Sequence, residues 1–176
     1  MAIDRQKTET VHWHAVFTAS RAEKKVRDRL EELGVECFLP VQTVLRQWTY
    51  RKSRVVVPVI AGLVFVRVGR QEQVKVLQTK GVVAFLRLKG EAGGAVIPDK
   101  QMEDFRFLLD FSEEAVEMTN ENIKAGDLVR VVKGSLRGME GELIRHKGVT
   151  KVLVRIDMLG CAMVNIPASF VEKLNK

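Results

Sequence analysis

The sequence predicts an α+β protein with two domains: an N-terminal domain of strands and helices, and a small C-terminal β-barrel. Apolar runs alternate with segments of helical period over residues 10–111. Residues 112–122, SEEAVEMTNEN, are polar and acidic without a clear period, which is typical of a linker. Residues 123–176 hold short β-rich runs separated by glycine-bearing turns, which favours a five-stranded barrel.

The first strand and helix are predicted from periodicity and capping residues. The run from His12 to Ala19 alternates between two faces and indicates a central strand. Ser20 and Glu23 form an S-x-x-E capping box, and apolar residues then recur at helical spacing until Gly34. We therefore expect a helix over residues 21–33.

A long β-hairpin is predicted next, over residues 41–58. Strand-like runs on either side enclose a polar, basic apex at residues 49–54. The remaining elements expected in this domain are strands at 35–39, 62–68 and 82–88, a helix at 71–80 with Val74 and Leu77 facing inward, and a helix from Pro98 to Phe111 with an apolar stripe of Met102, Phe105, Leu108 and Leu109.

The C-terminal runs fall at residues 127–133, 141–145, 151–156 and 161–166. Between the first two lies KGSLRGMEGEL, whose glycines are expected to supply positive φ angles and close backbone approach in a strand connection. A phosphate-binding loop is the alternative, but the segment lacks a G-K-S/T ending and no helix follows it.

Charge is distributed unevenly along the chain. The 176 residues carry 29 Lys and Arg against 22 Asp and Glu, a formal net charge of +7. Residues 1–100 hold 18 basic and 10 acidic side chains, whereas residues 101–126 hold 2 and 7. Basic blocks thus flank an acidic strip, which fits polyanionic partners, although charge alone fits a solvated surface equally well.

Composition argues against several classes of protein. No apolar run approaches the roughly 20 residues of a membrane-spanning helix, and the N-terminal MAIDRQKTET lacks the apolar segment of a secretion signal. The two cysteines, Cys37 and Cys161, lie far apart without a CxxC motif, so neither a disulfide framework nor a zinc site is expected. We expect a cytoplasmic monomer with no membrane association, cofactor or metal.

Catalytic residues are not recognisable in the sequence. His12 and His14 share one strand face, but no carboxylate or thiolate is placed beside them to complete a metal site. Cys37 begins an apolar run and is expected to act as a small buried hydrophobe. No Ser/His/Asp spacing stands out, so the chain is not predicted to be an enzyme.

The order of the segments resembles that of NusG-type transcription elongation factors. The KOW motif that opens their C-terminal domain resembles AGDLVRVVKGSLRGMEGELI at 125–144, and its remaining strands resemble VRIDMLGCAMVNIP at 154–167. Their N-terminal domain resembles the Trp13 strand, the helix at 21–33, ECFLP at 36–40, LVFV at 63–66, GVVAFL at 81–86 and PDKQM at 98–102. The resemblance implies an α/β sandwich, with an antiparallel sheet and flanking helices, followed by an SH3-like barrel.

One departure narrows the resemblance. Housekeeping members usually have Pro-Gly-Tyr before the valine-rich strand, whereas this chain reads Ile60-Ala61-Gly62-Leu63. It is therefore more similar to specialised paralogs of the RfaH and UpxY kind. This similarity implies an antitermination factor that suppresses pausing or termination on a specific operon, such as a polysaccharide locus. A general housekeeping factor and an RNA- or ribosome-binding KOW protein are the alternatives.

An apolar protein-binding surface is predicted on the N-terminal sheet. Strands 13–17 and 63–68 are apolar on both faces, so helices covering one face would leave a patch exposed on the other. Ordinary core packing is the alternative. The resemblance implies that this surface holds the β′ clamp helices of RNA polymerase, and the matching positions are Phe17, Ile60, Leu63, Phe65 and Phe85. The barrel would bind a further protein that the sequence does not identify.

Nucleic-acid contacts are predicted in two places. Lys25 and Arg29 lie four residues apart on the first helix, with Arg21 nearby, and the resemblance implies contact with the non-template DNA strand. The alternative is a solvated helix face paired with acidic neighbours. At the hairpin, Trp48 and Tyr50 would combine stacking with phosphate contacts from Arg51, Lys52 and Arg54, although a polar tip needs no such role.

Overall fold

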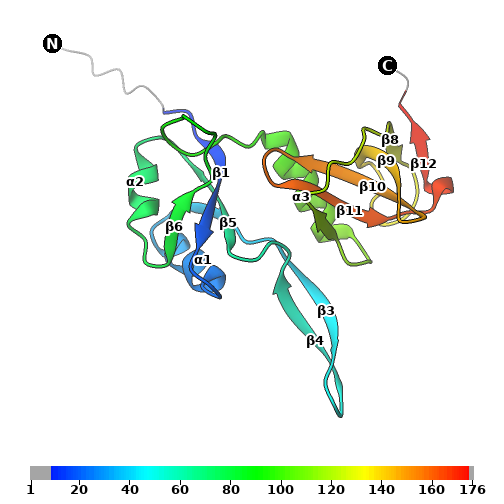
Figure 1. Ribbon diagram of the computed structural model, residues 1–176, viewed down its shortest axis with the longest axis horizontal. Coiled ribbons are helices and arrows are strands. Elements are labelled where there is room, and N and C mark those ends of the chain that lie inside the picture. Colours follow the sequence, from blue (N-terminus) through cyan, green and yellow to red (C-terminus); the bar gives the residue numbers. More distant parts are fainter. Residues whose placement is uncertain (1–8, 175–176) are drawn as a thin grey trace. The chain divides into compact units, whose positions relative to one another are not determined.

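The computed structural model describes residues 9–174 as a mixed α/β protein with antiparallel sheets and few helices (Figure 1). Contacts within the chain divide it into two compact units. The first unit joins the described residues up to Leu39 to Ala61–Ile97, and the second joins Pro40–Ile60 to the described residues from Pro98 onward. The predicted domain ranges, 10–111, 112–122 and 123–176, stay a prediction.

The first unit is built on a four-stranded antiparallel sheet with the strand order β2-β5-β1-β6. Strands β1 and β5 lie in its middle, which explains why their sequences are apolar on both faces. These strands confirm the predicted ones, with bounds β1 (His12–Thr18), β2 (Glu36–Phe38), β5 (Leu63–Val68) and β6 (Val82–Phe85).

Helix α1 (Glu23–Glu32) lies where the sequence predicts it and packs on β2 and β5. Its predicted capping box does not form, because the N-cap residue is Ala22 and no side chain caps the helix. The Glu23 carboxylate instead accepts a hydrogen bond from the Gly62 backbone N–H at 2.7 Å. Gly34 ends the helix as predicted, with φ of 74°.

Helix α2 (Glu72–Leu77) confirms the predicted helix but not its inward face. Val74 and Leu77 are 58% and 38% exposed, whereas Val76 is fully buried. The Glu72 carboxylate accepts a hydrogen bond from the Gly69 backbone N–H at 3.2 Å, which ties the helix start to the end of β5. At six residues, this helix is too short for periodicity to define its buried face.

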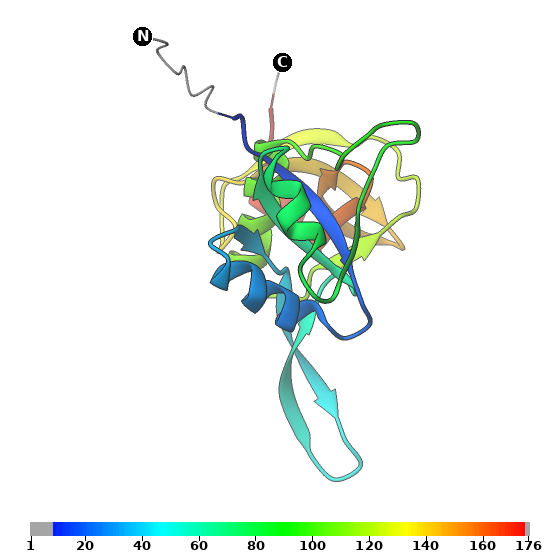
Figure 2. The same ribbon diagram turned by 90° about the vertical axis from the view of Figure 1, so that its left-hand side faces the viewer.

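The second unit contains the predicted hairpin and the predicted third helix. Strands β3 (Val41–Gln47) and β4 (Lys52–Pro58) form a two-stranded sheet of their own. Both views show it as an extended finger whose tip lies away from the other elements of its unit (Figures 1 and 2). Helix α3 (Asp99–Phe111) buries Met102, Phe105 and Leu108 of its predicted stripe.

The C-terminal strands form a six-stranded antiparallel sheet with the order β12-β8-β9-β10-β11-β7. Within residues 9–174 no ladder joins β12 to β7, so the predicted closed barrel stays a prediction. The strand bounds are β7 (Glu117–Thr119), β8 (Asp127–Val131), β9 (Glu140–His146), β10 (Val149–Ile156), β11 (Gly160–Asn165) and β12 (Val171–Lys173), and a short 3-10 helix spans Ala168–Phe170.

Part of the predicted linker is ordered as a strand. Strand β7 pairs with β11, and Glu117 forms an ion pair of 2.8 Å with Lys151, whose side chain is 5% exposed. The sequence conceals this strand because its partners lie more than thirty residues further along the chain. Its three residues carry too little pattern to reveal a long-range pairing.

The glycines of the first C-terminal connection behave as predicted. Gly134 and Gly138 have φ of 81° and 93°, which favours glycine. A Cβ atom on Gly141 would lie 2.9 Å from the Leu153 carbonyl oxygen, so β9 and β10 approach closely there.

Within the described part of the chain, no helix is both long and apolar enough to cross a membrane.

Candidate functional site

The predicted apolar surface is largely buried. Phe17 pairs with Leu63 and Ala15 with Phe65, so the three predicted side chains on β1 and β5 share a face. Only Phe17 is exposed, at 41%, whereas Leu63 and Phe65 are 1% and 0% exposed. The expected exposed patch therefore shrinks to the end of β1, because β5 is covered on both faces.

Two further residues of that predicted set lie elsewhere. Phe85 pairs with Val16, which places it on the opposite face of the sheet from Phe17, and it is 3% exposed. Its ring meets the His14 ring edge-on, with 5.8 Å between the ring centroids. Ile60 is half-buried in the other unit. A role for these residues in binding a partner stays a prediction.

The His14 side chain is held in a buried polar network rather than offered as a ligand. Its Nδ1 atom donates to the Ala95 carbonyl at 2.9 Å, so Nε2 is left as the acceptor, 3.5 Å from the Gln73 amide nitrogen. Burial lowers the pKa of His14 below its usual value of 6.5. This neutral ring fastens the connection between β6 and α3 onto β1.

Helix α1 carries Lys25 and Arg29 of the predicted basic ridge, and Arg21 lies just before the helix. Arg21 and Lys25 are exposed, and Arg29 donates a hydrogen bond of 2.7 Å to the Lys80 carbonyl oxygen. The alternative, a solvated helix face paired with Asp28, Glu31 and Glu32, stays open, although Asp28 pairs with Arg27 at 2.6 Å. Lys80, which is exposed, adjoins the ridge through a tertiary contact that periodicity cannot reveal.

The hairpin tip gathers exposed aromatic and basic side chains. Tyr50 is 97% exposed and Trp48 is 54% exposed. Arg51, Lys52 and Arg54 are exposed as predicted. Arg46 is exposed as well and was not predicted, although counting back two residues from Trp48 along the strand would have found it.

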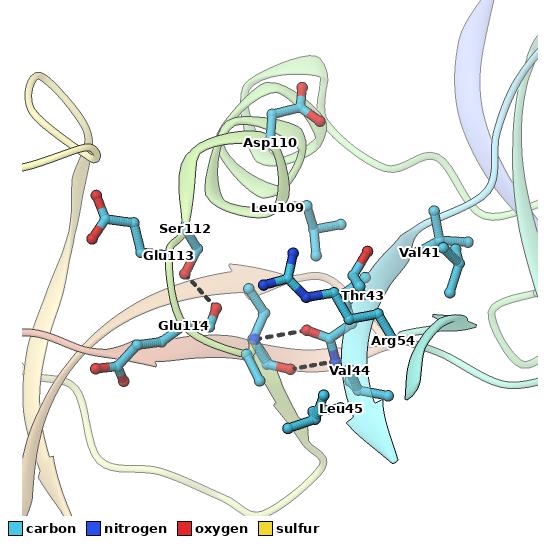
Figure 3. Close-up of a pocket in the computed structure, with 14 residues that line it drawn as sticks. Val41, Thr43, Val44, Leu45, Arg54, Leu109, Asp110, Ser112, Glu113 and Glu114 are labelled. Atoms are coloured by element: carbon cyan, nitrogen blue, oxygen red, sulfur yellow. Dashed lines mark hydrogen bonds between the residues drawn. The ribbon is translucent and has the colours of Figure 1, made fainter. Parts of the chain in front are cut away.

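A groove lies in the second unit beside the base of the hairpin (Figure 3). Two hydrogen bonds join the Gln42 side-chain amide to the Val116 backbone, at 3.1 Å to its oxygen and 2.8 Å to its nitrogen. The Arg54 side chain extends into the groove, whereas Glu113 and Glu114 point away from it (Figure 3). The groove measures about 650 Å³ and is lined by residues 41–45, Arg54, Val56, Leu109, Asp110 and residues 112–116.

The described residues offer no recognisable catalytic chemistry. Burial raises the pKa of the Cys37 thiol to about 11, which leaves it protonated near neutral pH and therefore a poor nucleophile. Between residues 9 and 174, no three His, Cys, Asp or Glu side chains lie close enough together to hold a metal ion.

Comparison with known proteins identifies the family. A family model described as "Transcription termination factor nusG" matches residues 11–106, more than half of the chain. A search of curated protein sequences finds no match.

One solved structure shares the fold at low sequence identity, and another matches over a similar length with a low TM-score. The structure "Domain interaction in Thermotoga maritima NusG" is 22% identical, covers 94% of this chain and 98% of its own, and has a TM-score of 0.51. The MjSpt4:Spt5 complex in its conformation A is 16% identical over 93% of this chain and 99% of that chain, with a TM-score of 0.28. Because the family model spans more than half of the sequence, this chain belongs to the NusG family.

Proposed function

We propose that this chain is a non-enzymatic transcription elongation factor that binds elongating RNA polymerase and suppresses pausing or termination. The family match over residues 11–106 carries the proposal. Binding surfaces without recognisable catalytic chemistry support it. A factor that binds the actively elongating state more tightly than the paused state lowers the paused population by mass action.

The polymerase contact is proposed at the end of β1, on the β′ clamp helices. Phe17 is the exposed aromatic side chain there, and exposed aromatic residues often dominate the energy of a protein interface. Leu63, which pairs with it and is buried, would hold the ring in place from within the sheet. This assignment replaces a broad apolar patch with one aromatic residue on a rigid strand.

The DNA contact is proposed on helix α1. Positive charge gathers here on Lys25 and Arg29, with Lys80 beside them. Among the described residues, Lys25 forms no ion pair with an acidic side chain. The exposed non-template strand of a transcription bubble supplies the matching phosphates and unstacked bases. Lys25 and Arg29 would then bias where the factor loads.

We further propose a specialised, operon-directed role of the RfaH and UpxY kind, for instance at a polysaccharide locus. The Ile60-Ala61-Gly62-Leu63 departure supports this over a housekeeping role. The C-terminal sheet would close as an SH3-like KOW barrel and recruit a separate protein. Covalent linkage would keep that recruited partner at high local concentration near the polymerase.

A pull-down with stalled elongation complexes tests the central proposal. Phe17→Ala should weaken binding about 30-fold, as expected for an aromatic hot spot. Val74→Ala, which trims another exposed apolar side chain of the same unit, is the matched control and should bind like wild type. Equal binding by both variants would remove Phe17 from the site. Co-purification with ribosomes and not with polymerase would favour the RNA- or ribosome-binding alternative.

A further inference from the structure

The β3–β4 hairpin is unusually basic for this chain. No Asp or Glu occurs between Glu36 and Glu72, although the chain has 22 acidic residues in 176. The hairpin therefore carries the charges of Arg46, Arg51, Lys52 and Arg54 with no acidic residue of its own to offset them. Positive charge left unbalanced over a whole element favours a polyanionic partner.

The register divides the hairpin side chains between two faces. Arg46 pairs with Ser53, whereas Gln47 pairs with Lys52 and therefore lies on the opposite face. The Trp48 indole Nε1 donates a hydrogen bond of 3.0 Å to Ser53 Oγ, which places the ring on the Arg46 side. Arg51, two residues before Ser53, continues the same face.

The other two cations belong to the opposite face. Lys52 pairs with Gln47 and Arg54 with Leu45, so both lie away from the indole. Figure 3 shows the Arg54 side chain extending into the groove beside the end of α3. The sequence alone grouped Arg51, Lys52 and Arg54 together, whereas the register separates Arg51 from the other two.

The aromatic side chains at the tip are held in place yet remain open to solvent. The Trp48 backbone N–H donates to the Arg51 carbonyl at 2.7 Å and closes the turn, while the indole is fixed by Ser53. Tyr50, the only tyrosine of the chain, stands almost wholly exposed within that turn. A fixed, half-exposed indole beside two guanidinium groups can stack on a nucleobase while the cations contact phosphates.

We infer that the hairpin tip, with Arg46, Trp48 and Arg51 on one face and Tyr50 in the turn, binds single-stranded polynucleotide, with Trp48 as the stacking platform. The inference rests on the proposed function only in that a transcribing polymerase exposes such strands. The single-stranded DNA of the bubble and the nascent RNA both offer unpaired bases for stacking and phosphates for ion pairing. Lys52 and Arg54 are not part of the site.

Binding of a short labelled oligonucleotide to the full chain tests the inference. The probes are an oligothymidylate and an oligouridylate of about 10 nucleotides, a length within the range that single-strand-binding folds cover. Anisotropy reports affinity, and tryptophan quenching reports the place, because Trp48 is half-exposed while Trp13, the other tryptophan, is 5% exposed. Saturable quenching by either probe is expected, and its absence would overturn the site.

Variants separate stacking from charge. Trp48→Ala should weaken binding about 5- to 100-fold, whereas Trp48→Phe should retain most of the affinity because a stacking ring remains. Arg46→Ala with Arg51→Ala should weaken binding strongly and lower the salt slope by about 1.4. Lys52→Ala with Arg54→Ala removes the same charge from the other face and should weaken binding much less. Equal losses in the two double variants would refute the assignment to one face.

The result is independent of the polymerase test. Phe17→Ala should bind both oligonucleotides like wild type, because Phe17 is not a hairpin residue. If the wild-type chain bound the oligonucleotides but not RNA polymerase, this inference would stand while the proposed function failed. Intact polymerase binding without oligonucleotide binding would overturn the inference alone.

Discussion

The Glu23 carboxylate should stabilise the first unit by joining three of its elements through hydrogen bonds. It is 8% exposed at the start of α1, and it accepts the Gly62 backbone N–H at 2.7 Å. The Gly62 carbonyl in turn accepts the Thr18 N–H at 2.9 Å. Through Gly62, this side chain therefore ties the start of β5 to both α1 and the end of β1.

Two contributions set the size of the expected effect. In Glu23→Ala the half-buried Gly62 N–H loses its acceptor, which costs about 1–2 kcal/mol. Loss of a carboxylate from the first helical turn adds about 0.5 kcal/mol. We expect a total near 2 kcal/mol for Glu23→Ala. Glu23→Gln keeps an oxygen acceptor and should cost only about 0.5–1 kcal/mol.

Urea unfolding in a Trp48→Phe background measures this difference, because Trp13 then becomes the only tryptophan and reports on the first unit alone. Hydrogen exchange at the Gly62 amide should quicken in Glu23→Ala and much less in Glu23→Gln. If the two variants unfold within about 0.3 kcal/mol of each other, the hydrogen bond contributes nothing and the reasoning is refuted.

Three further predictions concern pH, backbone and DNA. Burial lowers the pKa of His14 below 6.5, so the folded state favours the neutral ring. The free energy of unfolding should therefore fall as pH drops below 6.5, by at most about 1.4 kcal/mol per pH unit. His14→Gln should remove this dependence of stability on pH. Gly160→Ala should destabilise the second unit by about 3 kcal/mol, because φ at this position is +98° and the new Cβ would lie 2.1 Å from the Thr119 oxygen. Gly148→Ala, where φ is +80° and the space is open, should cost only about 1 kcal/mol. Urea unfolding followed by circular dichroism measures both. Lys25→Ala with Arg29→Ala should weaken recruitment to complexes with an exposed non-template strand and reduce the salt slope by about 1.4, with clamp-helix affinity unchanged.

Most strands and helices could be predicted because their patterns are local. The apolar run over His12–Thr18 and the helical period ending at Gly34 each indicate an element without reference to the rest of the chain. Strand β7 has only three residues and owes its existence to pairing with β11, so no local signal announces it.

The candidate sites were less predictable, because exposure depends on packing. A strand that is apolar on both faces does not tell which face is open, so Leu63 and Phe65 were expected at the surface and are buried. The Ser20–Glu23 pattern likewise fits a capping box, yet Gly62, 39 residues along the chain from Glu23, provides the donor. By contrast, alternation along β3 and β4 assigns each hairpin side chain to one of two faces once the hydrogen bond between Trp48 and Ser53 is known.

Gly62, within the segment Ile60-Ala61-Gly62-Leu63, is held by hydrogen bonds of its backbone to Glu23 and Thr18. Gly62 has φ of 71°, a left-handed conformation that a residue with a side chain adopts only with strain. This φ favours glycine whatever flanks it, and the Gly62 N–H and carbonyl are bonded to Glu23 and Thr18. Ala61 is exposed, and its small side chain leaves the surface before β5 without the bulk of a proline ring. We therefore expect that substitutions at Ile60 and Ala61 change the surface before β5 without disturbing the hydrogen bonds of Gly62, which hydrogen exchange at the Gly62 amide would test.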